Sequence, residues 1–314
     1  MTQAMPVNSK TPGEKMAQNS AVPALAESTH YDLNDLLVAY DFSEAADAAL
    51  KYAKMLAQRF GSFIHLLGVQ TPTEYSRALE GGPLAMELSQ RNLQLGLKLL
   101  EEHLRSEGIW SDSLRRIGNV ADTVEGSILE RRTDLLVIGA FGYGRIDRPR
   151  LGSTAEHLLR IVRCPVLVIG PHALPGGRDA PPIKRILCAM TTVEPPDNTL
   201  PFAGHLAAQM GASLEIVHVI DPTYKHVPRK ESERRCEAWA VQLRERGVPV
   251  AWTVIHGQAD QAIAARAATS KSSLILFGLH RIGNKTVDCA DGVVSATIRE
   301  AHCPVMTVPS NFSL

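Results

Sequence analysis

The second half of the chain repeats the first, and this repeat limits the possible folds more than any other sequence feature. Gly211–Val219 (GASLEIVHV) matches Gly61–Val69 (GSFIHLLGV) at a shift of 150 residues. Cys303-Pro-Val matches Cys164-Pro-Val at a shift of 139 residues. Each shift is constant over its own segment, so we infer one duplicated unit whose second copy has lost 11 residues.

Each copy alternates short apolar runs with segments of helical periodicity. The apolar runs of the first copy have the length and composition of buried strands, and they are Leu36–Tyr40, Phe63–Val69, Leu114–Ile117, Leu135–Ile138 and Pro165–Ile169. Strands that alternate with helices favour a parallel sheet covered by helices on both faces. The expected fold class is therefore α/β, with two tandem domains.

Composition divides the chain into four segments. Residues 1–30 are rich in Ala, Ser, Pro, Gln and Asn and are expected to form a disordered tail. Residues 31–170 form the expected first domain, and residues 171–182, rich in Pro and Gly, the linker. Residues 183–314 then form the second domain.

A glycine-rich segment follows the fourth apolar run of the first copy. The run ends at Gly139, and a loop with Gly142 and Gly152 leads to Ser153, Thr154 and a helix-patterned stretch. Glycines let backbone N–H groups approach an anion closely, and the start of a helix adds a partial positive charge. This order of strand, loop and helix predicts a phosphate cradle, although a tight connection without a ligand is the plainer alternative.

The spacing Gly139-x2-Gly142-x9-Gly152-Ser153-Thr154 resembles the nucleotide-binding signature of the universal stress protein family. The Asp41-Phe-Ser-Glu turn and the Cys164-Pro-Val-Leu-Val ending are similar to that family as well. The resemblance covers about residues 32 to 309 as a tandem pair. It implies two Rossmann-like domains of the adenine nucleotide alpha hydrolase type, each with a five-stranded parallel sheet in the order 3-2-1-4-5, flanked by helices.

In that strand order, strands one and four are neighbours, and a crevice opens at their carboxyl ends. The resemblance implies that ATP occupies this crevice in the first domain, often with Mg²⁺ or Mn²⁺ on its phosphates. The adenine would lie near Asp41 and Val69. The ribose and phosphates would contact the glycine loop and the residues after it, namely Gly139, Gly142, Gly152, Ser153 and Thr154.

Two features of the first copy have alternative readings. Asp41 is also suited to cap the helix that follows it, and one carboxylate has enough acceptor positions for both roles. Arg145, Arg148 and Arg150 lie inside the loop, where they would either neutralise phosphates or form a solvated surface.

The second copy departs from the signature. Gly278 is kept, but Arg281 takes the place of the second glycine, Asp291 that of the third, and Thr191 that of Asp41. A carboxylate inside the cradle would repel phosphate. A degenerate domain is therefore expected, with a different ligand as the alternative.

Composition and motifs argue against several other classes of protein. The formal net charge is zero and no apolar run reaches the about 20 residues of a membrane span, so neither nucleic acid nor a membrane is an expected partner. The five cysteines show no paired spacing, which favours a reducing compartment, the cytoplasm, and buried inert thiols. The histidines fit no metal-ligand motif, and no catalytic nucleophile or base stands out.

The expected function is a cytoplasmic universal stress protein that binds ATP in its first domain and regulates a stress response through the nucleotide. The alternatives are a nucleotide-independent interaction or scaffold protein and a slow ATPase. Because last strands pair across a dimer axis in the family, Pro165–Ile169 and Pro304–Val308 are expected to pair within the chain as a pseudo-dimer. Association into a homodimer is expected as well.

Overall fold

The computed structural model describes residues 25, 31–72, 76, 80, 82–142, 151–192, 198–222, 228–279, 281–282, 285–286, 290–309 and 312. The expected tail, residues 1–30, lies outside the described residues except for Leu25. The segment 143–150, with its three arginines, also lies outside them.

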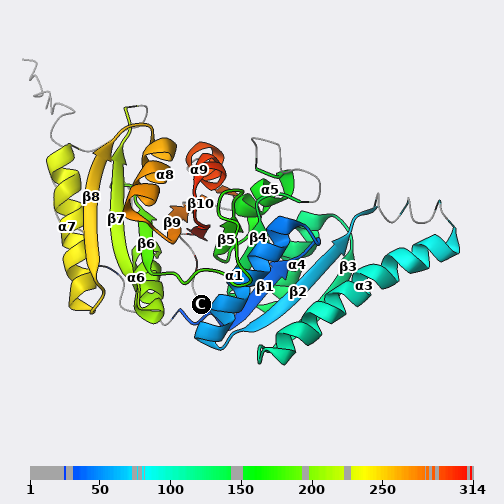
Figure 1. Cartoon of the computed structure of the whole chain (residues 1–314). Coiled ribbons are helices and arrows are strands. Elements are labelled where there is room, and N and C mark those ends of the chain that lie inside the picture. Colours follow the sequence, from blue (N-terminus) through cyan, green and yellow to red (C-terminus); the bar gives the residue numbers. More distant parts are fainter. Residues whose placement is uncertain are drawn as a thin grey trace, which may run out of the picture.

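The first copy consists of alternating strands and helices (Figure 1). They are β1 (Asp35–Ala39), α1 (Glu44–Phe60), β2 (Phe63–Gln70), α3 (Pro83–Ser106), β3 (Ser111–Ile117), α4 (Val120–Arg131), β4 (Leu135–Gly139), α5 (Ser153–Ile161) and β5 (Val166–Ile169). The strand predicted at Leu114–Ile117 begins three residues earlier, at Ser111. Its polar start is stabilised by partners: Ser113 Oγ donates to Glu101 of α3, and Asp112 contacts His65 of β2.

The second copy follows the same order and adds a small hairpin. Its elements are β6 (Arg185–Ala189), α6 (Thr199–Met210), β7 (Ser213–Ile220), α7 (Arg229–Glu245), β8 (Val250–His256), α8 (Ala259–Ser270), β9 (Leu274–Leu279), β10 (Arg281–Ile282), β11 (Lys285–Thr286), a π-helix (Ala290–Val294), α9 (Ser295–Glu300) and β12 (Val305–Pro309). The hairpin β10–β11 was not predicted from the sequence.

Ten strands form one continuous sheet in the order β3-β2-β1-β4-β5-β12-β9-β6-β7-β8. Each copy therefore contributes strands in the order 3-2-1-4-5, as expected, and the pairs within each copy are parallel. The copies meet where β5 and β12 pair antiparallel, with Leu167 opposite Met306. The predicted pairing of the last strands within the chain is thus confirmed.

Helices cover both faces of the sheet. Gly68 of β2 lies against Leu97 of α3, whereas Asp112, the partner of His65, is bound by Arg131 of α4. Since residues an odd number apart point to opposite faces of a strand, α3 and α4 lie on opposite sides of the sheet. None of the described helices combines the length and apolar character needed to cross a membrane.

The start of the first strand is fixed in the same way in both copies. Asp134 Oδ2 accepts the N–H groups of Asn34 and Asp35 at 2.8 and 2.9 Å. Ser273 Oγ, at the matched position, accepts those of Lys184 and Arg185 at 2.8 and 3.0 Å. Asp134 and Ser273 thus occupy equivalent positions in the two copies and accept the same pair of main-chain N–H groups, one through a carboxylate and the other through a hydroxyl.

Asp134→Ser is therefore expected to change the free energy of unfolding by less than about 1 kcal/mol, because the acceptor is kept. Burial raises the pKa of the Asp134 carboxyl, so its charge is not itself stabilising here. Asp134→Ala, which leaves two N–H groups without this acceptor, is expected to cost about 1–3 kcal/mol. Urea unfolding of both variants checks this, and equal losses for Ser and Ala would contradict it.

Candidate functional site

A cavity of about 540 Å³ opens at the carboxyl ends of β1 and β4. This is the position where ligands bind in open α/β sheets, because the strand order reverses there. All seven residues singled out from the sequence line this one cavity, and they are Asp41, Val69, Gly139, Gly142, Gly152, Ser153 and Thr154. Its volume lies within the range of small-molecule sites.

Asp41 follows β1 at one rim of the cavity. Its Oδ1 accepts the N–H of Ser43 at 3.0 Å. Ser43, rather than Asp41, is the N-cap of α1, since its Oγ accepts the N–H of Ala46 at 3.1 Å. The carboxylate is exposed, and Asp41 therefore stabilises the turn while presenting its charge at the cavity.

Two glycines at and just after the end of β4 lie in close contacts. A Cβ atom on Gly139 would lie 2.6 Å from the Cβ of Ala45, so α1 packs directly against the end of this strand. A Cβ atom on Gly142 would lie 2.9 Å from Asp41 Oδ2. The turn after β1 and the segment after β4 are therefore in contact beside the cavity.

The third glycine lies beside the end of β4 and precedes α5. Gly152 is the N-cap of α5, its N–H donates to Ala140 O at 2.9 Å, and a Cβ atom on it would lie 3.0 Å from that oxygen. No described side chain caps α5, so the N–H groups at Ser153 and Thr154 keep the donor capacity and partial positive charge of a helix N-terminus.

Several residues of the wall were not identified from the sequence. Thr71, Val120, Phe141 and Leu158 all line the cavity. Val120 begins α4, directly after the turn that follows β3, and so lies at the carboxyl ends of the strands. The expected strand order could therefore have predicted that Val120 lines the cavity. Thr71 follows β2 in the same way.

The matched position in the second copy has a different structure. Arg281, which corresponds to Gly142, begins the hairpin β10–β11 instead of a glycine loop. After β6, Thr192 Oγ1 lies 3.2 Å from His218 Nε2 and 3.1 Å from Ser232 Oγ, so protein side chains satisfy one another there. Asp291 lies in the π-helix, where the first copy has Gly152.

Four of the five cysteines are described, and all four are unpaired and buried: Cys164, Cys188, Cys236 and Cys303. Burial raises the pKa of the Cys164 and Cys303 thiols to about 12, which keeps them protonated and unreactive at neutral pH. Within the described ranges, no three His, Cys, Asp or Glu side chains are grouped closely enough to hold a metal ion.

The universal stress protein family model matches residues 33–170 and again residues 182–309. The chain belongs to the universal stress protein family. The two matches correspond to the two copies, so the chain is a tandem member. A universal stress protein of Thermus aquaticus is 29% identical over 136 residues, which is 43% of this chain and 96% of the relative. That relative thus matches one copy.

Solved structures of the family share the tandem fold. A universal stress protein from Archaeoglobus fulgidus has a TM-score of 0.71 at 17% identity, and the match covers 89% of this chain and 99% of that chain. A putative universal stress protein from Pseudomonas aeruginosa gives a TM-score of 0.60 at 18% identity, covering 89% of this chain and 94% of that one. At these identities the likeness concerns the fold alone.

Proposed function

We propose that the first copy binds ATP in the cavity at the ends of β1 and β4, and that the protein is a nucleotide-linked regulator of a stress response. One observation carries this proposal. Three glycines with close backbone contacts, an uncapped helix start and a carboxylate lie around one cavity of about 540 Å³. These are the groups that a nucleotide requires from a protein.

In this proposal the adenine and ribose occupy the side of the cavity near Asp41 and Val69. The phosphates lie against the backbone at Gly142 and Gly152 and accept hydrogen bonds from the start of α5. The cavity is roomy there because glycine has no Cβ. Asp41 is the one carboxylate among the described lining residues, so Mg²⁺ or Mn²⁺ would be held mainly by the phosphates themselves.

The second copy, in our proposal, does not bind ATP at the matched position. A hairpin stands in place of the glycine loop, and the Thr192–His218–Ser232 contacts satisfy polar groups internally. The second copy then acts as a scaffold that completes the ten-stranded sheet. ATP regulates the protein if it binds one conformation or assembly better than another.

Asp41→Ala is expected to weaken ATP binding by about 10- to 100-fold, because a charged hydrogen-bond acceptor for the nucleoside is lost. Isothermal titration calorimetry of the whole chain measures this. Thr191→Ala is the matched control, since Thr191 holds the corresponding position in the second copy. We expect one ATP per chain and no effect of the control. An equal effect of both changes would contradict the assignment.

We also propose that the protein works in the cytoplasm, where its buried unpaired thiols remain reduced. A homodimer remains a proposal as well. Because β5 and β12 already pair with each other inside the chain, a second copy of the chain would have to use another surface. Light scattering of the purified chain decides between monomer and dimer.

A further inference from the structure

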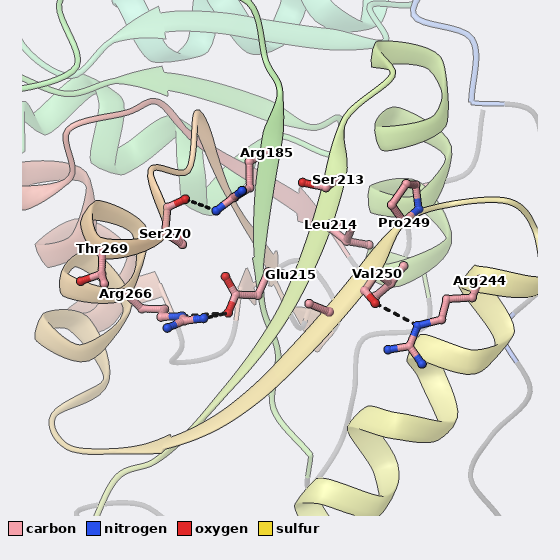
Figure 2. A pocket seen from close by; sticks show the side chains of 11 residues that line it. Arg185, Ser213, Leu214, Glu215, Arg244, Pro249, Val250, Arg266, Thr269 and Ser270 are labelled. Carbon is pink, nitrogen blue, oxygen red and sulfur yellow. Dashed lines mark hydrogen bonds and ion pairs between the residues drawn. The ribbon is translucent and has the colours of Figure 1, made fainter.

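A second cavity, of about 690 Å³, lies in the second copy, at the amino ends of β6, β7 and β8 (Figure 2). Arg185 of β6, Glu215 of β7, and Arg266 and Ser270 of α8 line it, together with Ser213 and Val250. It is therefore separate from the cavity proposed for ATP, which lies at carboxyl strand ends of the first copy.

The first copy provides an internal comparison for this cavity. The strand register shows which residues are equivalent in the two copies. Asp35 lies beside Phe63 in the first copy, and Arg185 lies beside Ser213 in the second. Likewise, His65 lies beside Asp112 on the neighbouring strand of the first copy, and Glu215 lies beside Ala251 in the second. The last residues of α4 and α8 match in the same way. Three large residues of the first copy thus correspond to small ones in the second: Phe63 to Ser213, Asp112 to Ala251, and Arg131 to Ser270.

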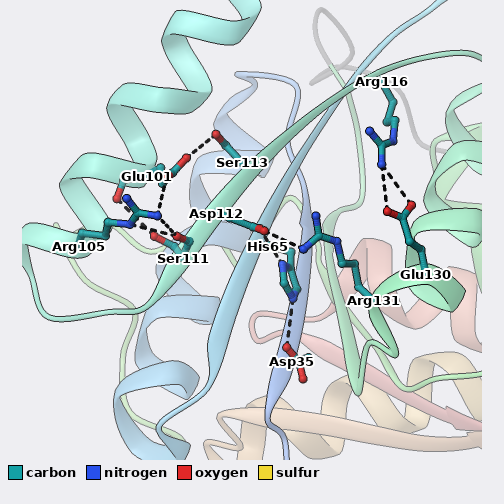
Figure 3. Close-up of polar contacts among 10 residues, drawn as sticks. All are labelled: Asp35, His65, Glu101, Arg105, Ser111, Asp112, Ser113, Arg116, Glu130 and Arg131. Atoms are coloured by element: carbon teal, nitrogen blue, oxygen red, sulfur yellow. Dashed lines mark hydrogen bonds and ion pairs between the residues drawn. The ribbon is translucent and has the colours of Figure 1, made fainter.

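In the first copy, Asp112 and Arg131 interact closely with His65 at the amino ends of the strands (Figure 3). His65 lies between two carboxylates, with Nδ1 2.7 Å from Asp112 and Nε2 3.1 Å from Asp35. Arg131 donates to the other oxygen of Asp112 at 2.8 Å, and the Phe63 ring lies 4.8 Å from the His65 ring. The polar groups of this edge are therefore satisfied within the protein.

In the second copy the charges at this edge are reversed as well. Glu215, buried where the first copy has His65, accepts from Arg266 Nε at 2.8 Å, so these two charges compensate each other. Arg185 stands where the first copy has Asp35, and it donates to the main-chain oxygen of Ser270. No carboxylate of the described residues pairs with Arg185, so its positive charge is not compensated at the cavity.

Arg244, on the other side of β8, has a different role. Its Nε donates to Val250 O at 2.9 Å, just as Arg105 of the first copy donates to Ser111 O at 3.1 Å. Arg244 also pairs with Glu237 at 3.0 Å. Arg244 also lines the cavity, but because the first copy has the same main-chain contact, we assign Arg244 to holding the end of α7 against β8.

We propose that this cavity binds the phosphate or carboxylate group of a small organic anion, with Arg185 as its main ligand. A guanidinium binds such groups through two parallel N–H donors. The hydroxyl groups of Ser213 and Thr269 line the same cavity and supply further donors. Leu214, Val250 and Ala251 form an apolar wall for the body of the ligand. The proposal does not depend on ATP binding in the first copy.

The test is a calorimetric titration of the full chain with phenyl phosphate, with benzoate and with inorganic phosphate. We expect phenyl phosphate or benzoate to bind more tightly than inorganic phosphate, and the comparison of the first two identifies the preferred head group. Ala251→Asp with Ser270→Arg rebuilds the first copy's closed edge and is expected to weaken binding about 10- to 100-fold. Arg185→Gln, which changes one surface side chain, is expected to do the same.

Two controls make the result specific. Arg229→Gln removes the same charge from α7, outside the cavity, and is expected to leave binding unchanged. Gly152→Asp alters the first-copy cavity, and it is also expected to leave binding of the anion unchanged. Circular dichroism confirms that each variant is folded. Absence of binding to the unaltered chain, or binding that Gly152→Asp removes and Arg185→Gln keeps, would overturn the proposal.

Discussion

Replacing Gly152 by aspartate is expected to weaken ATP binding by about 100- to 1,000-fold, which converts to about 2.7–4 kcal/mol. Gly152 precedes the start of α5, where the phosphates would lie, and a Cβ atom added there would lie 3.0 Å from Ala140 O. Two unit charges about 4 Å apart repel by about 4 kcal/mol at the effective dielectric constant of a protein surface. Calorimetric titration with ATP measures the loss.

Two further variants distinguish the effect of a charge at position 152 from the effect of a larger side chain there and from a change in the net charge of the protein. Gly152→Ala adds only the Cβ atom and is expected to weaken ATP binding much less than aspartate does. Gly126→Asp adds the same charge in α4, where nothing lies within 4 Å of the new Cβ, and is expected to have no effect. Aspartate already stands at the matched position of the second copy, Asp291. ATP binding of ordinary affinity by Gly152→Asp would show that phosphate does not lie here.

Leu167→Asp is expected to lower the free energy of unfolding by about 4 kcal/mol or more. Leu167 is fully buried on β5 and lies opposite Met306 of β12, where the sheets of the two copies join. A carboxylate at this position would lose its hydration in the middle of a ten-stranded sheet. Urea unfolding of the full chain measures the change.

The control places the same type of substitution at the free edge of that sheet. Ile117 is the last residue of β3 and is 47% exposed, so Ile117→Asp is expected to cost less than about 1 kcal/mol. A loss at Leu167 as small as the loss at Ile117 would mean that the two copies do not depend on the β5–β12 pairing.

The fold was predictable because buried parallel strands are continuous apolar runs and because the chain carries two copies of them. The start of β3 was missed because Ser111, Asp112 and Ser113 are polar, and the side chains that stabilise them, among them Glu101, His65 and Arg131, lie on other elements. The hairpin β10–β11 was missed because two-residue strands show no periodicity.

The candidate sites differ in how far the sequence predicts them. The glycine spacing identified five residues that line one cavity, Gly139, Gly142, Gly152, Ser153 and Thr154, and the family resemblance added Asp41 and Val69. Close contacts that glycine permits shape this cavity. The cavity beside Arg185 has no such motif. Its lining includes Ser213, Ala251 and Ser270, which lie far apart in the sequence and which only the strand register of the folded chain brings together.

A crystal structure of the full chain grown with ATP and magnesium tests the central claim most directly. We predict density for one nucleotide per chain, with its phosphates at Gly142, Gly152 and the start of α5, and none at the matched position beside β10–β11. A first-copy cavity that stays without nucleotide at saturating ATP, or a nucleotide bound only in the second copy, would contradict the proposed function.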